Sequence, residues 1–158
     1  TPNAPYRMTP RILTTAIASI TLSTAVWAAD TESTPVRNAQ IDNFAVGKKA
    51  VDDKKWAQAV DAFNKVVAAD PKNADAYNYL GFSYRWMDKY PEAFAAYGKA
   101  LALDPNHKGA LNYSGIAYLK SGQKAKAEEQ LQRLQNVCAS CEETAQLGKA
   151  LSEASVAK

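Results

Sequence analysis

The segment from residue 40 to residue 134 repeats with a period of 34 residues, and this period constrains the fold more than any other feature of the chain. Small residues and large apolar residues recur at fixed places in three successive units. The equivalent positions are Gly47, Gly81 and Gly115; Ala59, Ala93 and Ala127; and Phe63, Tyr97 and Leu131. A unit of this length buries its apolar face only by stacking on its neighbours. The period therefore predicts a stacked array that presents a surface, which favours a binding module over an enzyme.

The central unit indicates that each repeat is a pair of helices. Tyr77, Leu80, Gly81 and Tyr84 follow the i, i+3, i+4, i+7 spacing of one helical face. Pro91 suits the first turn of the next helix, because its missing N–H removes no hydrogen bond there. The same reasoning over all units predicts helix pairs at residues 40–53 with 56–69, 74–87 with 91–103, and 108–121 with 124–137.

The same unit also carries a family resemblance. Its large and small residues are Tyr77, Leu80, Gly81, Tyr84, Tyr90, Ala93, Tyr97, Ala100 and Pro105. This set resembles the motif of the tetratricopeptide repeat family. The resemblance implies an all-α fold, namely a right-handed α-α solenoid of three units at residues 40–73, 74–107 and 108–137. It also implies a C-terminal capping helix, and residues 138–158 are interpreted as a cysteine-containing junction followed by that helix.

A short basic stretch and an uncharged apolar run precede the repeats. Residues 12–26 carry no charge, and Val26-Trp27-Ala28 places small residues at the −3 and −1 positions of a cleavage site. This is the layout of a secretory signal peptide, and the run is shorter than the roughly 20 residues of a membrane-spanning helix. We expect a signal peptide with upstream residues at 1–28, a linker at 29–39, a periplasmic location, and no stable membrane insertion after cleavage. An uncleaved anchor is the alternative.

The first helix of each pair is expected to line the concave side of the array. Moving one residue along a helix rotates by about 100° around its axis. This step leads from the core stripe, the apolar face that packs in the core, to the neighbouring face. The predicted peptide-binding groove is Phe44, Lys48, Asn78, Phe82, Arg85, Trp86, Asn112 and Ile116. Asparagine amides can both donate to and accept from a peptide backbone, and the ring of Trp86 suits an aromatic anchor. The alternative is that Phe82 and Ile116 pack between adjacent repeats.

The resemblance does not extend to the family's two-carboxylate clamp, which grips the acidic C-terminus of chaperones. Phe44 and Gly109 occupy places where that clamp has polar or basic groups. The clamp is therefore not carried over to this chain.

Cys138 and Cys141 lie at the junction before the capping helix and are the two cysteines of the chain. In an oxidising compartment, cysteines this close most simply form a disulfide, which is the prediction. A redox-active pair, a metal site and free thiols are the alternatives. A helix N-terminus would stabilise a thiolate here, but the βαβ scaffold usual for such chemistry is not visible. A c-type haem site is excluded, because Glu142 and not histidine follows the second cysteine.

The rest of the chain shows no catalytic constellation. His107 is the one histidine, so the serines lack a base, and there is no glycine-rich phosphate loop. The chain carries +3, and subtracting Arg7 and Arg11 leaves +1 for residues 29–158, which argues against nucleic acid as a partner. We expect no enzymatic activity, no cofactor and no metal.

The expected function is a scaffold or chaperone-like adaptor of the bacterial cell envelope that binds a protein or peptide. Two alternatives come from other classes. One is a thiol–disulfide redox factor that uses Cys138 and Cys141. The other is a structural repeat protein that associates with copies of itself, and hence forms a homo-oligomer.

Overall fold

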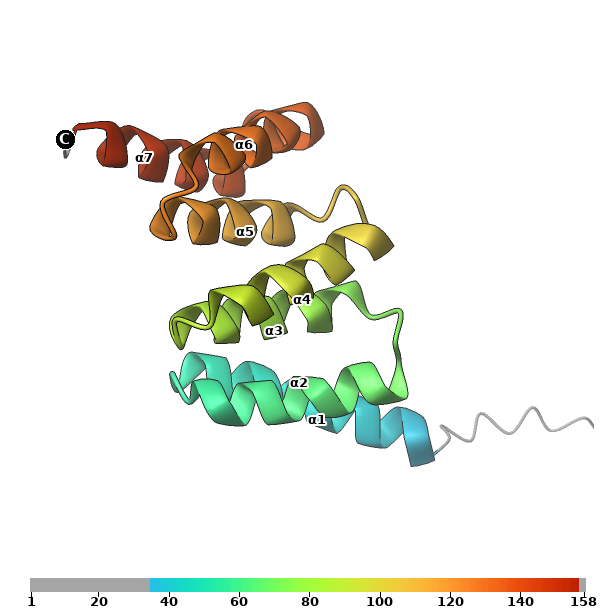
Figure 1. Cartoon of the computed structure of the whole chain (residues 1–158). Helices are drawn as coiled ribbons and strands as arrows, with labels where there is room; N and C mark the ends of the chain where they lie inside the picture. The colour runs from blue at the N-terminus through green and yellow to red at the C-terminus, as the bar shows by residue number, and fades with distance from the viewer. Residues whose placement is uncertain (1–34, 157–158) are drawn as a thin grey trace, which may run out of the picture. The chain divides into compact units, whose positions relative to one another are not determined.

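The structure is a computed structural model that describes residues 35–156, with side chains from residue 42 onward. Within this part the chain forms three helical hairpins and a final helix, and no strand (Figure 1). The hairpins are α1 (Pro35–Asp52) with α2 (Trp56–Ala69), α3 (Ala74–Trp86) with α4 (Tyr90–Leu103), and α5 (Lys108–Lys120) with α6 (Lys124–Cys138). The final helix is α7 (Glu142–Val156). The predicted all-α solenoid is confirmed, whereas the predicted signal peptide and its cleavage site lie outside the described residues.

The predicted helix boundaries agree with the observed ones to within one or two residues, except at the start of α1. That helix begins at Pro35 rather than at residue 40, so the last part of the predicted linker is helical. A proline is accepted in the first turn of a helix because the N–H that it lacks has no partner within the helix at that point. None of the described helices is both long and apolar enough to cross a membrane.

The first two hairpins close where a glycine of one helix meets an aromatic ring of the other. A Cβ added at Gly47 would lie 2.7 Å from Cζ of Phe63, and a Cβ added at Gly81 would lie 2.6 Å from Cδ1 of Tyr97. Both rings are buried, and they belong to the core residues of their repeats. The recurring pair of glycine and ring therefore sets how closely the two helices of a hairpin approach.

The third hairpin is completed by α7, which packs on both α5 and α6. In this unit Leu131 stands at the position that Phe63 and Tyr97 occupy in the first two units. The side chain that contacts Gly115 is instead the buried Leu147 of α7, whose Cδ2 would lie 2.5 Å from an added Cβ. Leu147 stands 34 residues after Tyr113. The capping helix thus continues the repeat as the first helix of a further unit.

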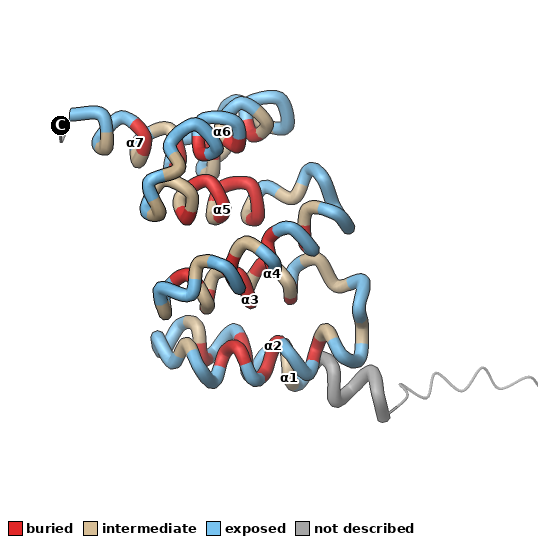
Figure 2. The backbone as a smooth tube through the Cα atoms, viewed as in Figure 1, coloured by how far each residue is buried: buried red, intermediate tan, exposed pale blue. Residues whose placement is uncertain are grey.

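The turn inside each hairpin places one residue in the left-handed region. Lys54, Asp88 and Gly122 have φ values of 58°, 56° and 79°, and they stand 34 residues apart. The buried residues lie on the faces where helices pack, while the turns are largely exposed (Figure 2). The period seen in the sequence is therefore a period in backbone conformation as well as in packing.

Candidate functional site

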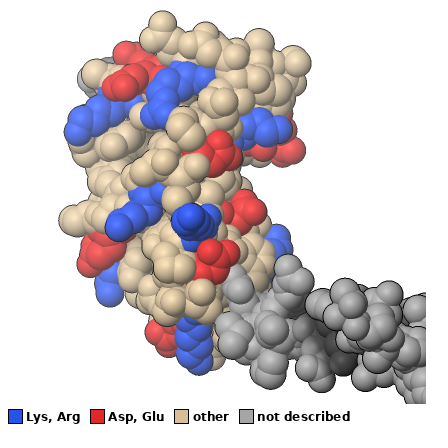
Figure 3. Space-filling view, turned by 90° about the vertical axis from the view of Figure 1, so that its right-hand side faces the viewer, with Lys and Arg blue, Asp and Glu red and all other residues tan. Residues whose placement is uncertain are grey.

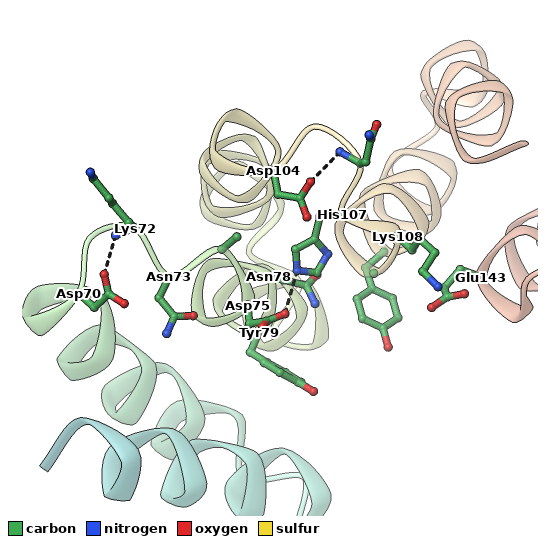
Figure 4. Close-up of a pocket in the computed structure, with 14 residues that line it drawn as sticks. Asp70, Lys72, Asn73, Asp75, Asn78, Tyr79, Asp104, His107, Lys108 and Glu143 are labelled. Atoms are coloured by element: carbon green, nitrogen blue, oxygen red, sulfur yellow. Dashed lines mark hydrogen bonds and ion pairs between the residues drawn. The ribbon is translucent and has the colours of Figure 1, made fainter. Parts of the chain in front are cut away.

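A cleft of about 660 Å³ opens beside the N-terminal halves of α3 and α5 (Figure 4). Its walls come from α3, from α5, from the turns that precede these helices, and from the start of α7. The side chains used below are Asp75, Asn78 and Tyr79 of α3, His107 before α5, Lys108 and Tyr113 of α5, and Glu143 of α7. Three repeats thus contribute to one concave site.

Asn78 lines this cleft with an incompletely paired amide. Its side chain is 5% exposed, and its Oδ1 has no hydrogen-bond partner. Gly109 stands opposite, and a Cβ there would lie 3.0 Å from Nδ2 of Asn78, so glycine leaves room for the amide. A buried polar group without a partner costs roughly 1–3 kcal/mol. A peptide group of a ligand can both donate and accept, and could therefore pair with this amide.

His107 ties the beginnings of α3 and α5 together. Its Nδ1 accepts a hydrogen bond from the backbone N–H of Ala110 at 3.2 Å, which caps α5. Nε2 therefore carries the ring proton and donates to Oδ1 of Asp75 at 3.0 Å (Figure 4). This contact links the first turn of α3 to the residue that caps α5. His107 was noted from the sequence only as the one histidine of the chain, and this contact was not predicted.

Charges of both signs surround the cleft. Lys108 lies beside Glu143 in Figure 4. A hydrogen bond from the backbone N–H of Glu143 holds the pKa of its carboxyl below the usual range, and the positive charge of Lys108 adds to this effect. Basic and acidic residues are also interspersed over the face of the molecule shown in Figure 3. On that face neither the basic nor the acidic residues form a continuous patch of one charge.

Aromatic rings extend the site from the cleft along α3 to the start of α2, and we call Trp56, Phe82, Trp86 and Tyr113 the aromatic surface. Phe82 contacts Tyr113 with ring centroids 4.8 Å apart. Trp86 is 51% exposed and stacks on Trp56 at 5.4 Å with an interplanar angle of 7°. The predicted residues Phe82 and Trp86 are therefore brought together with two aromatic residues that sequence reasoning missed.

Arg85 lies beneath the aromatic surface and not in an open groove. It is 7% exposed, and its Cζ lies 5.0 Å from the ring centroids of both Phe82 and Trp86. No carboxylate of the described residues forms an ion pair with it, so the ring faces supply its electrostatic stabilisation. Burial raises the pKa of the Tyr97 hydroxyl well above its usual range, and the nearby charge of Arg85 opposes part of that shift.

Phe44 and Lys48 do not line the cleft themselves but contact Tyr79, which does. Phe44 is half-buried and meets the rings of Phe63 and Tyr79 edge-on, at 5.4 and 5.8 Å. Lys48 is exposed, and its Nζ donates to the Tyr79 hydroxyl at 2.8 Å, a hydrogen bond that raises the pKa of the lysine. Tyr79 was not predicted to be part of the site. The signal that could have found it is the 34-residue register that it shares with Tyr113.

The structure does not place Asn112 and Ile116 in an open groove, in contrast to the prediction. Asn112 is 1% exposed, and its Nδ2 donates to Oε1 of Gln146 at 2.8 Å. Ile116 packs against the core cluster that contains Leu147 and Leu151. The reason is that α7 covers this part of α5, so both residues contribute to packing between repeats.

Cys138 and Cys141 are free thiols in the structure, which therefore does not show the predicted disulfide. Cys138 ends α6, whereas Cys141 immediately precedes α7 and its carbonyl accepts from the backbone N–H of Ala145 at 3.2 Å. Cys141 is thus the N-cap residue of α7. Within residues 35–156 no group of three or more potential metal-binding side chains comes together.

Solved structures with similar folds include domains bound to peptides. The TPR2B domain of yeast Sti1 in a pHsp70 complex is 22% identical, with a TM-score of 0.71, over 77% of this chain and 99% of that chain. The second TPR domain of human RPAP3 in complex with the HSP70 peptide SGPTIEEVD is 20% identical, with a TM-score of 0.68, over 76% and 98%. The Yersinia enterocolitica type III secretion translocator chaperone SycD is 19% identical, with a TM-score of 0.67, over 76% and 91%. At these identities the similarity shows the fold alone.

Sequence comparison with curated proteins finds no match. Three families described as tetratricopeptide repeat match the chain, at residues 45–85, 74–107 and 96–129. These overlapping matches extend from residue 45 to residue 129, which is more than half of the 158 residues. Together with the stacked hairpins, they show that the chain belongs to the tetratricopeptide repeat family.

Proposed function

We propose that this protein binds a segment of another protein in the cleft between α3 and α5 and along the adjoining aromatic surface. The observation that carries the proposal is the buried, incompletely paired amide of Asn78, which lies in a cleft flanked by accessible aromatic rings. Peptide binding by similar folds supports it, since the Sti1 and RPAP3 domains are seen in complexes with pHsp70 and with an HSP70 peptide. The role is that of a scaffold, and it requires no catalytic side chain.

Two kinds of contact would bind the segment, a polar contact with Asn78 and an apolar contact with Trp86. The amide of Asn78 pairs with a main-chain group of the segment and sets its register. The exposed ring of Trp86, backed by Trp56, offers a flat apolar surface to a side chain of the segment. Aromatic residues are common among those that dominate binding energy. The area available on three repeats is limited, so we expect modest affinity for an isolated segment.

The binding experiment uses a random peptide library displayed on phage and selected against the immobilised full chain. Enriched peptides are then titrated by fluorescence anisotropy against wild-type protein, Asn78→Ala and Trp86→Ala. A lost hydrogen bond of about 1 kcal/mol corresponds to about a fivefold weaker Kd, and loss of the ring is expected to weaken binding at least as much. Gln58→Ala, which removes an exposed amide from α2, is the matched control and is expected to bind as wild type.

Two results would contradict the binding proposal. One is that no peptide is enriched over a library selected on an unrelated helical protein. The other is that enriched peptides bind Asn78→Ala and Trp86→Ala as tightly as wild type. Circular dichroism of both variants confirms that a loss of binding does not come from a loss of helix.

We further propose that the protein acts in the bacterial cell envelope, as an exported adaptor in the periplasm. The support is the basic stretch, the uncharged run and the small residues before Ala29 in the sequence. N-terminal sequencing of the protein recovered from a periplasmic fraction is expected to begin at Ala29. Recovery only from the cytoplasm, or with the leader retained in the membrane fraction, would contradict this location.

A further inference from the structure

The two cysteines share a set of hydrogen bonds at the junction of α6 and α7. Sγ of Cys141 donates to the backbone carbonyl of Cys138 at 3.1 Å and lies 3.4 Å from Oγ1 of Thr144. The buried Thr144 hydroxyl itself donates to the same carbonyl. Both cysteines are half-buried, so each retains access to solvent. The binding function proposed above uses none of these groups.

The surroundings of the two thiols differ in a way that makes them chemically unequal. Cys141 caps the 15-residue helix α7, whose N-terminus favours negative charge. Burial alone would raise the pKa of Cys141. Hydrogen bonds to the thiolate from Cys138 and from Thr144, whose hydroxyl then turns from the Cys138 carbonyl to Sγ, outweigh burial, and the net pKa is lowered. Hydrogen bonding to Cys141 and burial raise the pKa of Cys138. The carboxylate of Glu143 is the nearby group that opposes ionisation of Cys141.

We propose that Cys141 is a reactive thiol that exchanges with disulfides, and that Cys138 is the partner that resolves the mixed disulfide. In the first step the Cys141 thiolate attacks one sulfur of an external disulfide, forms a mixed disulfide and releases one thiolate. In the second step the deprotonated Cys138 attacks Sγ of Cys141 and releases the second thiolate. The two cysteines lose two electrons and two protons, and the external disulfide is reduced to two thiols.

Oxidation would act on the element that completes the third repeat. Cys138 is the last residue of α6, and Cys141 begins α7. A bond between their sulfurs therefore joins the ends of two helices that already pack together. It would hold α7 at one angle to α6, and with it Gln146, which pairs with Asn112. Thr144 is a positioning residue in this scheme, because it acts through hydrogen bonds to the cysteine pair.

The first experiment measures which thiol reacts. The fully reduced full chain is treated with a limiting amount of iodoacetamide near neutral pH, and the alkylated peptides are quantified by mass spectrometry over time. Cys141 is expected to react several-fold faster than Cys138. Thr144→Val is expected to slow Cys141, and Glu143→Gln is expected to accelerate it. Glu153→Gln, an exposed carboxylate at the far end of α7, is the matched control and should leave the rate unchanged.

The second experiment follows the exchange itself with oxidised glutathione as the probe. Wild-type protein is expected to lose two hydrogen atoms in mass and to form an intramolecular disulfide. Cys138→Ser is expected to accumulate a glutathione adduct on Cys141, which circular dichroism should show to be carried by a folded protein. Equal alkylation rates, faster reaction of Cys138, or failure of wild type to form the intramolecular bond would each overturn the proposal.

Discussion

The contact between Gly81 and Tyr97 leads to the sharpest prediction about stability. Gly81 lies in the middle of α3 with helical backbone, so alanine at this position fits the backbone and would by itself favour the helix. The space is the obstacle. An added Cβ would stand 2.6 Å from both Cδ1 and Cε1 of the Tyr97 ring, which is 1% exposed. The ring is held from all sides and cannot turn away without displacing its neighbours.

The two effects oppose each other and differ in size. Replacing glycine by alanine in a helix interior gains about 1 kcal/mol. Overpacking a filled core typically costs about 1–3 kcal/mol and occasionally more. The contact at Gly81 is far shorter than van der Waals separation and is made with a rigid ring, so its cost belongs at or above the upper end of that range. We expect Gly81→Ala to lower the free energy of unfolding by about 2 kcal/mol.

Gly98→Ala is the matched control for this substitution. Gly98 lies inside α4, is exposed, and an added Cβ would meet nothing within 4 Å. It therefore gains the helix preference alone and should stabilise the protein by about 0.5–1 kcal/mol. Urea titration followed by circular dichroism gives both free energies of unfolding. If Gly81→Ala proves as stable as wild type while Gly98→Ala behaves as expected, the close approach of α3 and α4 described above is wrong.

Three further predictions concern a turn, a cap and a titration. Lys54→Gly should raise the free energy of unfolding by about 0.5 kcal/mol, and with it the urea midpoint, because lysine is held at a φ of 58°. An unchanged or lower midpoint would argue against a strained turn. Asn73→Ala should cost about 1 kcal/mol in the same titration, since the Asn73 side chain accepts from the backbone N–H of Ala76 at 2.9 Å, whereas Asn73→Asp should retain the cap. Burial raises the folded-state pKa of Tyr97 above its unfolded value of about 10, so its contribution to stability is present below that pH and is lost as the pH rises above it. Tyr97→Phe should therefore weaken the fall in urea midpoint between pH about 8 and about 11, and an identical fall in both proteins would count against this origin.

The helix pairs were predictable because their signals are local. Pro91 and the glycine at residue 122 mark helix starts and turns within a few residues of chain. The apolar spacing in each unit identifies the buried face, and the 34-residue period shows that every unit buries it in the same way. The start of α1 at Pro35 was missed because no apolar stripe accompanies that extra stretch of helix.

The candidate site was predictable only in part. Turning one residue from the core stripe selected Phe82 and Trp86, which the structure brings together in the aromatic surface, and Asn78, which lines the cleft. The same rotation selected Asn112 and Arg85, which are buried as Asn78 is but do not line the cleft. A helical wheel ranks faces by direction from the helix axis, but whether a face is open depends on what arrives from other helices.

By itself, the sequence determined the number of hairpins, their order and the small or large residue at each contact, because these follow from spacing along one chain. Tertiary structure alone decided which polar groups stay available to a partner. Gln146 reaches Asn112 across 34 residues, and two neighbouring rings hold the guanidinium of Arg85 in the absence of an ion pair within the described residues. Burial is a property of the space between elements, and that space exists only once distant segments have packed.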